Sequence, residues 1–383
     1  LSLIDERSAR HTFGKANSGP DVQLTVHDAR FYAAVLQSGT LGAAESFIDG
    51  WWSSDTLTDL IRLLVINRQA MRTLDSGWSR LLLPFRLVLH ALSRNTFAGS
   101  RRNIAAHYDL SNELFALMLD PTMMYSCALF DPPSLTLEQA STAKLDLICR
   151  KLQLAPTDHL LEIGTGWGGM AIHAAARFGC RVTTTTISKA QATLARERIA
   201  AAGLSDKITV IEQDYRALTG TFDKLVSIEM IEAVGHHYLD AYFRACGRLL
   251  KPDGLMLLQA ITIQDRDYAG ALRQVDFIQK HIFPGSFIPS LGAIQSAVAR
   301  ASLLRPIHIH DIGDHYVRTL DAWRSNFLSN LDAVRQLGFD DRFIRLWNFY
   351  LCYCQGAFHE RHIGDAQILL AGPRFRGAST PAA

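Results

Sequence analysis

The feature that most constrains the fold is an alternation of two periodicities that begins near residue 152. Short apolar or β-branched runs, typical of buried strands, occur at residues 160–164, 181–188, 207–214, 222–230 and 254–263. Helical patterns separate them at residues 170–178, 191–202 and 238–250. Strands that alternate with helices indicate βαβ units and a parallel sheet. We therefore expect an α/β fold with helices on both faces of the sheet.

The first 100 residues have a different pattern, and we expect them to form a smaller, mainly helical domain. One strand-like segment, residues 22–27, precedes helical patterns at residues 41–52, 57–68 and 78–92. The last pattern is apolar and lies among arginines, from Arg80 to Arg102. An apolar helix flanked by arginine can lie on an anionic membrane. A core helix with solvated arginine ends is the alternative, and periodicity alone favours it.

Composition excludes several classes of protein. Hydrophobic residues make up 48% and charged residues 20%, which rules out a disordered chain. Lys+Arg 39 against Asp+Glu 37 gives a net charge of +2, which argues against bulk attraction to nucleic acid. The six cysteines form no CxxC pair, so we expect no metal site and a reducing compartment. No signal peptide or membrane span is apparent, and we expect a cytoplasmic protein that can still bind a membrane surface.

A glycine-rich turn, GTGWGG at residues 164–169, lies between a predicted strand and a predicted helix. Glycines there let the backbone approach a ligand at the helix start. Gly164, Gly166 and Gly169 nearly match a dinucleotide fingerprint, but threonines stand where the second strand should end in an acid. The acids are instead Glu162, before the glycines, and Asp214. This layout resembles that of class I S-adenosylmethionine (SAM) methyltransferases more than that of NAD-binding proteins.

Longer motifs resemble those of cyclopropane fatty acid synthases and their mycolic-acid-modifying relatives, and they run through nearly the whole chain. They are LGAAESFIDGWW, HYDLSNELFALMLD, MMYSCALF, LEIGTGWGGM, TISKAQ, QDYR, IEMIEAVG, HIFPGSFIPS, HYVRTLDAW and FYLCYCQGAF. The resemblance implies a Rossmann-like class I SAM methyltransferase that methylates the cis double bond of an unsaturated acyl chain in membrane phospholipid and forms a cyclopropane. It also implies a homodimer, bound peripherally to the inner face of the membrane.

With this resemblance, we expect three parts of the chain. Residues 1–100 would form a lipid- or membrane-docking domain, and residues 101–375 the catalytic domain. The final segment, GPRFRGASTPAA, looks disordered, with residues 376–383 as a flexible tail.

The resemblance also implies the residues of the site. The cofactor would contact Tyr125, Ser126, Glu162, Gly164, Thr165, Gly166, Trp167, Gly168, Thr186, Ile187, Ser188, Gln191, Asp214, Tyr215 and Arg216. A bicarbonate ion, the base for ring closure, would be held by Cys127, Glu232, the backbone of Ile261 and Tyr316. Cys354 matches a cysteine long suspected as catalytic, but alkene methylation needs no thiol, so we interpret it as a pocket-lining residue. The alternative for Tyr215, Cys127 and Cys354 is a packed side chain without a role in the reaction.

One site residue departs from the family pattern. Gln259 stands where the family usually has histidine, and an amide can hydrogen-bond an anion but cannot become cationic. This substitution weakens the expectation of bicarbonate binding and of ring closure, and leaves methylation without closure as an alternative. A small-molecule methyltransferase and a non-catalytic lipid-binding protein are further alternatives. The first would leave the N-terminal extension unexplained, and the second predicts an eroded glycine loop, which this chain does not have.

Overall fold

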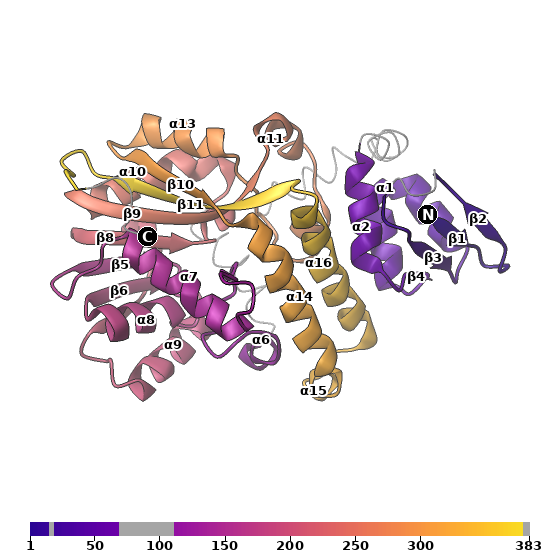
Figure 1. The fold of residues 1–383 in the computed structure, drawn as a ribbon, viewed down its shortest axis with the longest axis horizontal. Coiled ribbons are helices and arrows are strands. Elements are labelled where there is room, and N and C mark those ends of the chain that lie inside the picture. The colour runs from indigo at the N-terminus through magenta and orange to yellow at the C-terminus, as the bar shows by residue number, and fades with distance from the viewer. Residues whose placement is uncertain (15–18, 69–110, 378–383) are drawn as a thin grey trace.

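A seven-stranded sheet forms the centre of the computed structural model, which describes residues 1–14, 19–68 and 111–377 (Figure 1). Its strand order is β10-β11-β9-β8-β5-β6-β7. The strands are β5 (His159–Ile163), β6 (Arg181–Thr186), β7 (Ile208–Glu212), β8 (Phe222–Ile228), β9 (Leu250–Ile263), β10 (Arg305–Asp311) and β11 (Ile363–Ala371). The first five of these coincide with the predicted strands.

Alternate residues of the central strands point to opposite faces, and each face is covered by helices. Leu160 packs with α7 (Leu137–Lys151), α8 (Gly169–Phe178) and α9 (Lys189–Ala201). Its neighbour Leu161 packs on the other face with α10 (Leu239–Leu249) and α13 (Leu291–Ala301). The prediction of an α/β fold with helices on both faces is therefore confirmed.

The sheet is parallel from β7 to β9, and its order reverses at β5, which pairs in parallel with both β6 and β8. Ligands of such sheets bind beyond the carboxyl ends of the strands, at the point where the order reverses. The loops after β5, β7 and β8 leave the sheet at this edge. They carry the glycine turn, Asp214 and the IEMIEAVG motif.

The C-terminal part was not predicted in detail. Strand β11 pairs antiparallel with β9 and β10, and it completes the sheet. The helices around it are α6 (Asn112–Met118), α11 (Asp265–Ala271), α12 (Phe277–His281), α14 (Gly313–Ser329), α15 (Leu331–Gln336) and α16 (Asp341–His359). Among these, α14 and α16 pack side by side between the sheet and the N-terminal part of the chain (Figure 1).

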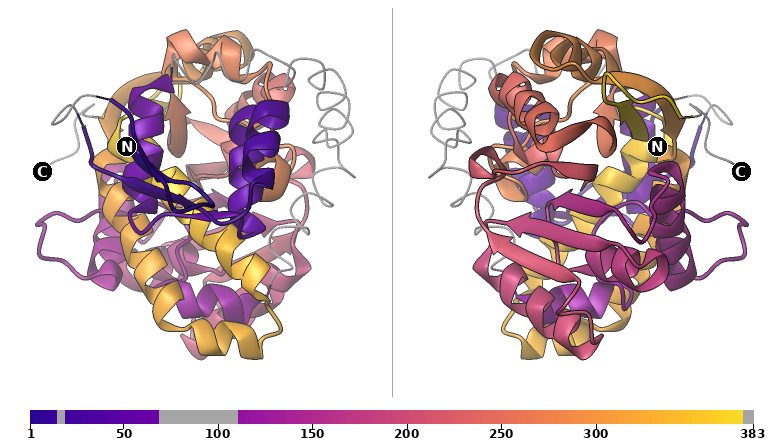
Figure 2. Two further views of the ribbon diagram at one scale, coloured as in Figure 1. Left: turned by 90° about the vertical axis from the view of Figure 1, so that its right-hand side faces the viewer. Right: turned by 90° about the vertical axis from the view of Figure 1, so that its left-hand side faces the viewer.

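The N-terminal part contains more strands than predicted. A four-stranded sheet has the order β2-β1-β3-β4, where only β3 (Gln23–Val26) had a recognisable pattern. The others, β1 (Ser2–Ile4), β2 (Arg10–Thr12) and β4 (Trp52–Ser53), are too short to show a period. Helix α2 (Leu57–Ile66) agrees with its predicted pattern, whereas α1 (Arg30–Ile48) begins before the pattern at 41–52 and ends before Trp52, which belongs to a strand. The left view of Figure 2 shows this part as a layer in front of α14 and α16.

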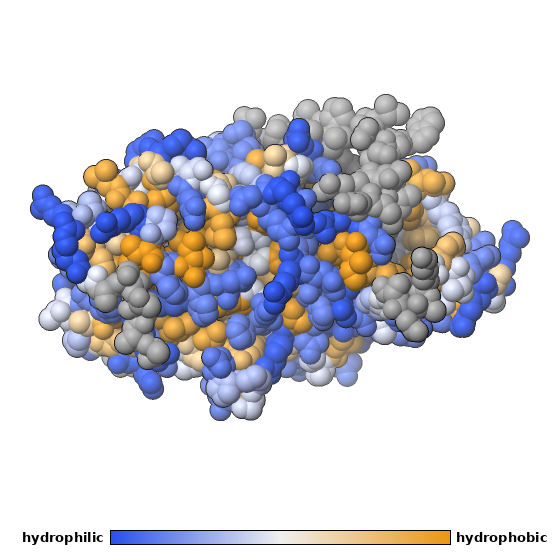
Figure 3. All heavy atoms as spheres, turned by 45° about the horizontal axis from the view of Figure 1, so that its top comes forward, coloured by the Kyte–Doolittle hydropathy of each residue, from blue (hydrophilic) through white to orange (hydrophobic). Residues whose placement is uncertain are grey.

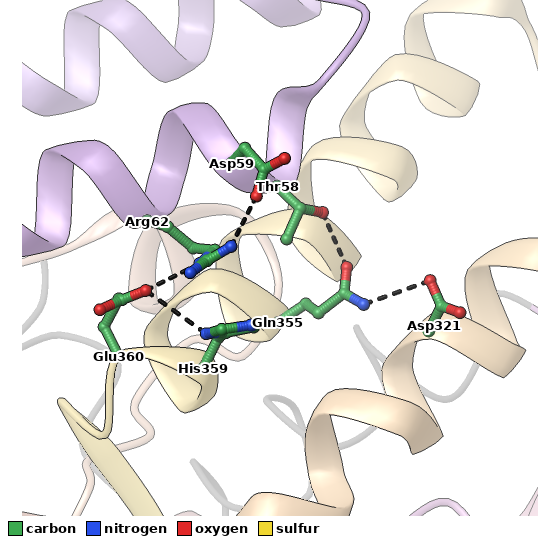
Figure 4. Close-up of polar contacts among 7 residues, drawn as sticks. All are labelled: Thr58, Asp59, Arg62, Asp321, Gln355, His359 and Glu360. Atoms are coloured by element: carbon green, nitrogen blue, oxygen red, sulfur yellow. Dashed lines mark hydrogen bonds and ion pairs between the residues drawn. The ribbon is translucent and has the colours of Figure 1, made fainter. Parts of the chain in front are cut away.

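Helix α2 is fastened to α16 by close packing and by a polar cluster (Figure 4). Arg62 donates to Glu360 at 2.7 Å and to Asp59 at 2.8 Å, and Thr58 donates to Gln355 at 2.7 Å. A Cβ added at Gly356 would lie 2.7 Å from a side-chain carbon of Ile61, so only glycine allows this approach. The N-terminal part therefore shares a continuous interface with the helices that border the site.

The prediction of a disordered C-terminal segment was wrong for its first residues. The Gly372 amide donates to Gly254 O, the Arg374 amide donates to Pro252 O, and Phe375 is buried beside the sheet. Residues 378–383 lie outside the described residues, as does the arginine-flanked pattern at 78–92. Within the described part of the chain, no helix is long and apolar enough to cross a membrane.

Candidate active site

A cavity of about 450 Å³ opens at the carboxyl edge of the sheet, at the point where the strand order reverses. Of the residues predicted from the sequence, the cavity is lined by Tyr125, Ser126, Glu162, Gly164, Thr165, Gly166, Trp167, Thr186, Ile187, Gln191, Asp214, Tyr215, Arg216, Glu232, Ile261, Tyr316 and Cys354. The other four predicted residues do not line the cavity and lie behind the residues that do. Gly168 and Ser188 are the N-caps of α8 and α9, while Cys127 and Gln259 are fully buried.

The glycine turn forms one end of the cavity. Gly164 and Gly166 have φ values of 103° and 51°, a region that favours glycine. A Cβ added at Gly166 would meet no atom within 4 Å, because this residue faces the open cavity. The turn thus combines an accessible backbone with the start of α8, and the space beside it fits a cofactor.

Buried acids flank the glycine turn. Glu162 accepts a hydrogen bond from the Thr184 hydroxyl at 2.6 Å, and burial raises its pKa to about 8. Asp214 is held by the Arg216 guanidinium, with N–O distances of 2.8 and 2.6 Å. Tyr215 lines the cavity and also packs edge-to-face on Tyr242, so the interpretation as a packed aromatic describes it equally well. Carboxyl groups at this end of the cavity can form hydrogen bonds with the polar atoms of a cofactor.

The other end of the cavity is lined by two carboxyl groups of the loop after β8, Glu229 and Glu232, and a third, that of Asp365 on β11, is fully buried behind the wall. Glu229 follows β8 and accepts from the Cys127 amide at 2.8 Å, the Gln259 side chain at 2.8 Å and the Tyr316 hydroxyl at 2.6 Å. Glu232 accepts from the Ile261 amide at 2.6 Å. Asp365, on β11, accepts from Gln259 at 2.9 Å. Every residue expected to hold bicarbonate therefore lies in this cluster.

Burial and mutual repulsion act on these carboxyl groups. Burial, followed by the charge of Glu229, raises the pKa of Glu232 to about 8. The same two causes raise the pKa of Asp365 well above its usual range. Lys144, fully buried nearby, donates to Ser126 at 2.8 Å, and burial lowers its pKa. In the cofactor-free protein, Glu232 and Asp365 therefore favour the protonated form at neutral pH.

Sequence reasoning missed four members of this cluster. Glu229 lies within a motif that was noted, directly after a predicted strand, and that position was a usable signal. Lys144, Asp365 and Gln367 lie in a helix and a strand that gave no signal of their own. The Gln367 side chain donates to Gln259 at 3.1 Å and accepts from buried Lys151 at 2.7 Å, so a polar chain extends behind the cavity wall.

The remaining wall is apolar and aromatic. It includes Leu272, Ile278, Phe283, Phe287, Tyr353 and Phe358. Tyr125 and Tyr350 share a hydrogen bond of 2.7 Å between their hydroxyl groups. Burial raises the pKa of Cys354, so its thiol keeps its proton, as expected of a wall residue rather than a nucleophile. The cavity can accommodate a long apolar group beside the carboxyl groups.

Comparison with known proteins agrees with this geometry. The profile of a family described as mycolic acid cyclopropane synthetase matches residues 96–368. The tuberculostearic acid methyltransferase UfaA1 of Mycobacterium tuberculosis is 38% identical over 345 residues, which cover 88% of this chain and 80% of that protein. The cyclopropane-fatty-acyl-phospholipid synthase of Escherichia coli K12 is 36% identical over 362 residues, covering 93% and 89%.

A solved structure gives the same result. The mycolic acid cyclopropane synthase CmaA1, in complex with SAH and CTAB, superposes with a TM-score of 0.64 at 32% identity, over 71% of this chain and 98% of that one. The fold and the site thus define a SAM-dependent methyltransferase. Within that class, the chain belongs to the mycolic acid cyclopropane synthetase family.

Proposed function

We propose that this protein uses SAM to methylate the cis double bond of an unsaturated acyl chain in membrane phospholipid, and that it forms a cyclopropane. The observation that carries the proposal is one continuous cavity, which joins the glycine turn to carboxyl groups and to an apolar wall. An alkene is a poor nucleophile, so it must be aligned with the methyl donor in a dry pocket. The relatives named above are enzymes of acyl-chain modification.

Different residues of the cavity have different roles in the reaction. SAM supplies an electrophilic methyl group when it is bound. The glycine turn and the acids beside it orient the cofactor, and the aromatic wall excludes water and aligns the acyl chain. Glu229 and Glu232 stabilise the positive charge that develops on the second alkene carbon. Aromatic faces, including that of Tyr316, add a weaker attraction for the same charge.

Phospholipid is proposed as the substrate because of the N-terminal part of the chain. The family profile begins at residue 96, whereas the match to the Escherichia coli phospholipid synthase covers 93% of the chain and so includes most of the preceding residues. We assign residues 1–100 to membrane docking and residues 101–375 to catalysis, in a peripheral homodimer at the inner face of the membrane. On the face drawn in Figure 3, apolar residues form small groups between hydrophilic ones.

Docking can be measured by vesicle flotation. Arginines between residues 80 and 102 should favour anionic lipid by about 1 kcal/mol each, and salt should weaken this attraction. Binding should therefore be stronger to anionic than to neutral vesicles, and stronger at low salt than at high salt. Equal binding in all four conditions would contradict the electrostatic part of the docking proposal.

Methylation without ring closure is the second candidate. It is favoured by Gln259 in place of histidine and by the similarity to a protein named as a methyltransferase rather than a cyclopropane synthase. Both reactions share the transfer of the methyl group. They differ in which proton is removed afterwards.

Mass spectrometry of lipids from cells that express the protein tests the proposal. Ring formation adds one CH₂ and removes the double bond, whereas methylation without closure adds CH₂ and keeps unsaturation. Dimethyl disulfide, which adds to alkenes and not to cyclopropanes, separates the two products. Cells that express a Gly166→Val variant are the control. Unchanged lipids in cells with soluble wild-type protein would contradict the function.

A further inference from the structure

The hydrogen bonds at the carboxyl end of the cavity are inconsistent with a bound bicarbonate ion that acts as the base. The expected cradle offers an anion four groups: the Cys127 amide, Gln259, the Ile261 amide and Tyr316. Each of these already donates to a carboxyl group of this chain, three to Glu229 and one to Glu232. A bicarbonate ion in the same place would meet the Glu229 carboxylate, which carries the same charge and fills the same donors. The residues present therefore do not fit the ion.

We propose that the carboxylate of Glu229 takes the place of bicarbonate and is the base of the reaction, a proposal that rests on the proposed function. Glu229 lines the same cavity as Ser126, Gly164 and Glu232, so its side chain is within the reaction space. Its two oxygens take the donors expected for the ion: Oε1 accepts from Cys127 and Gln259, and Oε2 accepts from Tyr316. The protein thus carries its base as a side chain.

The backbone supports this assignment. Glu229 has a φ of 46°, a left-handed conformation that is uncommon for residues other than glycine. Its amide donates to Gln259 O at 2.8 Å, which holds the turn in place directly after β8. Strained residues of this kind cluster at functional sites. Here the strained turn directs the carboxylate into the cluster of donors.

In this arrangement Gln259 has a positioning role. Its amide nitrogen donates both to Glu229 and to Asp365, and its oxygen accepts from Gln367. An imidazole cannot donate two hydrogen bonds from one nitrogen, and a cationic imidazole would form an ion pair with Glu229. The neutral amide instead positions the carboxylate. Glu229 accepts three hydrogen bonds and lines the cavity, whereas Asp365 lies behind the wall, so Glu229 is the carboxyl group positioned to accept a proton.

The reaction needs no reactant other than SAM and the alkene. The π electrons of the alkene form a bond to the methyl carbon while its bond to the sulfur of SAM breaks, and that electron pair stays on sulfur. The second alkene carbon becomes cationic. Glu229 accepts a proton from the new methyl group, and the C–H electron pair closes the ring. If Glu229 instead takes a proton from a carbon next to the cation, the electron pair forms a new double bond. The proton leaves Glu229 for solvent after the products depart.

The test compares bicarbonate binding and turnover in wild-type protein, Glu229→Ala and Glu229→Gln. Carbon-13 NMR of labelled bicarbonate measures binding to each protein in the presence of SAH. Turnover is measured with SAM and vesicles of unsaturated phospholipid, in buffer freed of CO₂ and with added bicarbonate. Glu360→Ala, which removes a carboxylate outside the cavity, is the matched control.

We expect wild-type protein and Glu360→Ala to bind no bicarbonate and to show turnover that is independent of it. Glu229→Ala should lose about 100-fold or more in turnover, bind bicarbonate in the vacated space and regain activity as bicarbonate is added. Glu229→Gln should be equally inactive and gain nothing, because its amide fills the space without accepting a proton.

Three results would overturn the proposal: bicarbonate-dependent turnover of wild-type protein, near-wild-type turnover of Glu229→Gln, or a folded Glu229→Ala that neither binds bicarbonate nor responds to it. If Glu229→Ala does not fold, Glu229→Gln still decides through its turnover. The proposed function fails separately: wild-type protein that binds SAM but modifies no phospholipid contradicts the function, whereas binding of labelled bicarbonate to that protein would contradict the assignment of Glu229.

Discussion

The two ends of the cavity are built in different ways. At the cofactor end, consecutive residues of one turn supply the backbone, and Gly166 leaves space that any side chain would fill. At the carboxyl end, groups from segments that are distant in the sequence meet, and Glu229 alone joins Cys127, Gln259 and Tyr316. One end therefore depends on backbone conformation, and the other on the placement of side chains by the whole fold.

This difference separates binding from chemistry. A backbone site binds the cofactor before and after the reaction and contributes little that is specific to the transition state. A cluster of buried carboxyl groups acts mainly when positive charge develops, and a contribution confined to the transition state alters turnover but not affinity. Substitutions at the two ends should thus affect different measurements, which gives the comparison its tests.

The largest effect is expected at the cofactor end. Gly166→Val should abolish SAM binding in calorimetry, because the added side chain would occupy the cavity and would be strained at a φ of 51°. Gly203→Val is the matched control, since Gly203 has a φ of 67° and open space around it but lies outside the cavity. Gly166→Val protein that binds SAM normally would refute the assignment of the turn.

A large effect on turnover alone is expected at the carboxyl end. Glu232→Gln keeps the shape of the side chain and its acceptor for the Ile261 amide, but it removes the charge that forms in the working enzyme. Turnover should fall about 100-fold or more if the carboxylate acts on the transition state. The affinity for SAM should hardly change. A parallel loss of affinity and turnover would show that the two ends are not separable.

The same variant should change how stability depends on pH. In folded wild-type protein Glu232 keeps its proton up to about pH 8, whereas the unfolded chain releases it above about 4.5. Because the folded state binds more protons in this window, wild-type stability from this group falls as pH rises through it. The melting temperature of Glu232→Gln, relative to wild type, should therefore increase from pH 5 to pH 8.5. A constant difference would mean that Glu232 is not buried in its neutral form.

The smallest effect is expected at the apolar wall. Cys354→Ala should lower turnover only a few-fold, because the thiol is protonated and contributes packing rather than charge. Kinetics with phospholipid vesicles would measure this, with Cys354→Ser as the variant of similar size. Complete loss of turnover in a folded Cys354→Ala protein would require a chemical role for the thiol.

The contrast between the two ends also explains what could be predicted from the sequence. The strand–turn–helix at β5 is local, so the glycine turn and Glu162 were recognisable from neighbouring residues. Asp365 interrupts an otherwise apolar strand, and nothing near it in the sequence indicates that β11 places its side chain within hydrogen-bond distance of Gln259. Lys144 lies in an ordinary helical pattern. The short N-terminal strands could not be predicted for a different reason, because a strand of two or three residues cannot show a period.

The apolar wall has a consequence for kinetics. An acyl chain that moves from the bilayer core into a cavity lined by Ile278, Phe283 and Phe358 passes from one apolar environment into another. The transfer itself therefore contributes little binding free energy. The quantity that saturates such an enzyme is the mole fraction of unsaturated lipid in the membrane surface, not its concentration in the bulk suspension. Diluting the substrate with saturated phospholipid at constant total lipid should therefore slow the reaction, whereas adding more vesicles of the same composition should not accelerate it once the protein is membrane-bound.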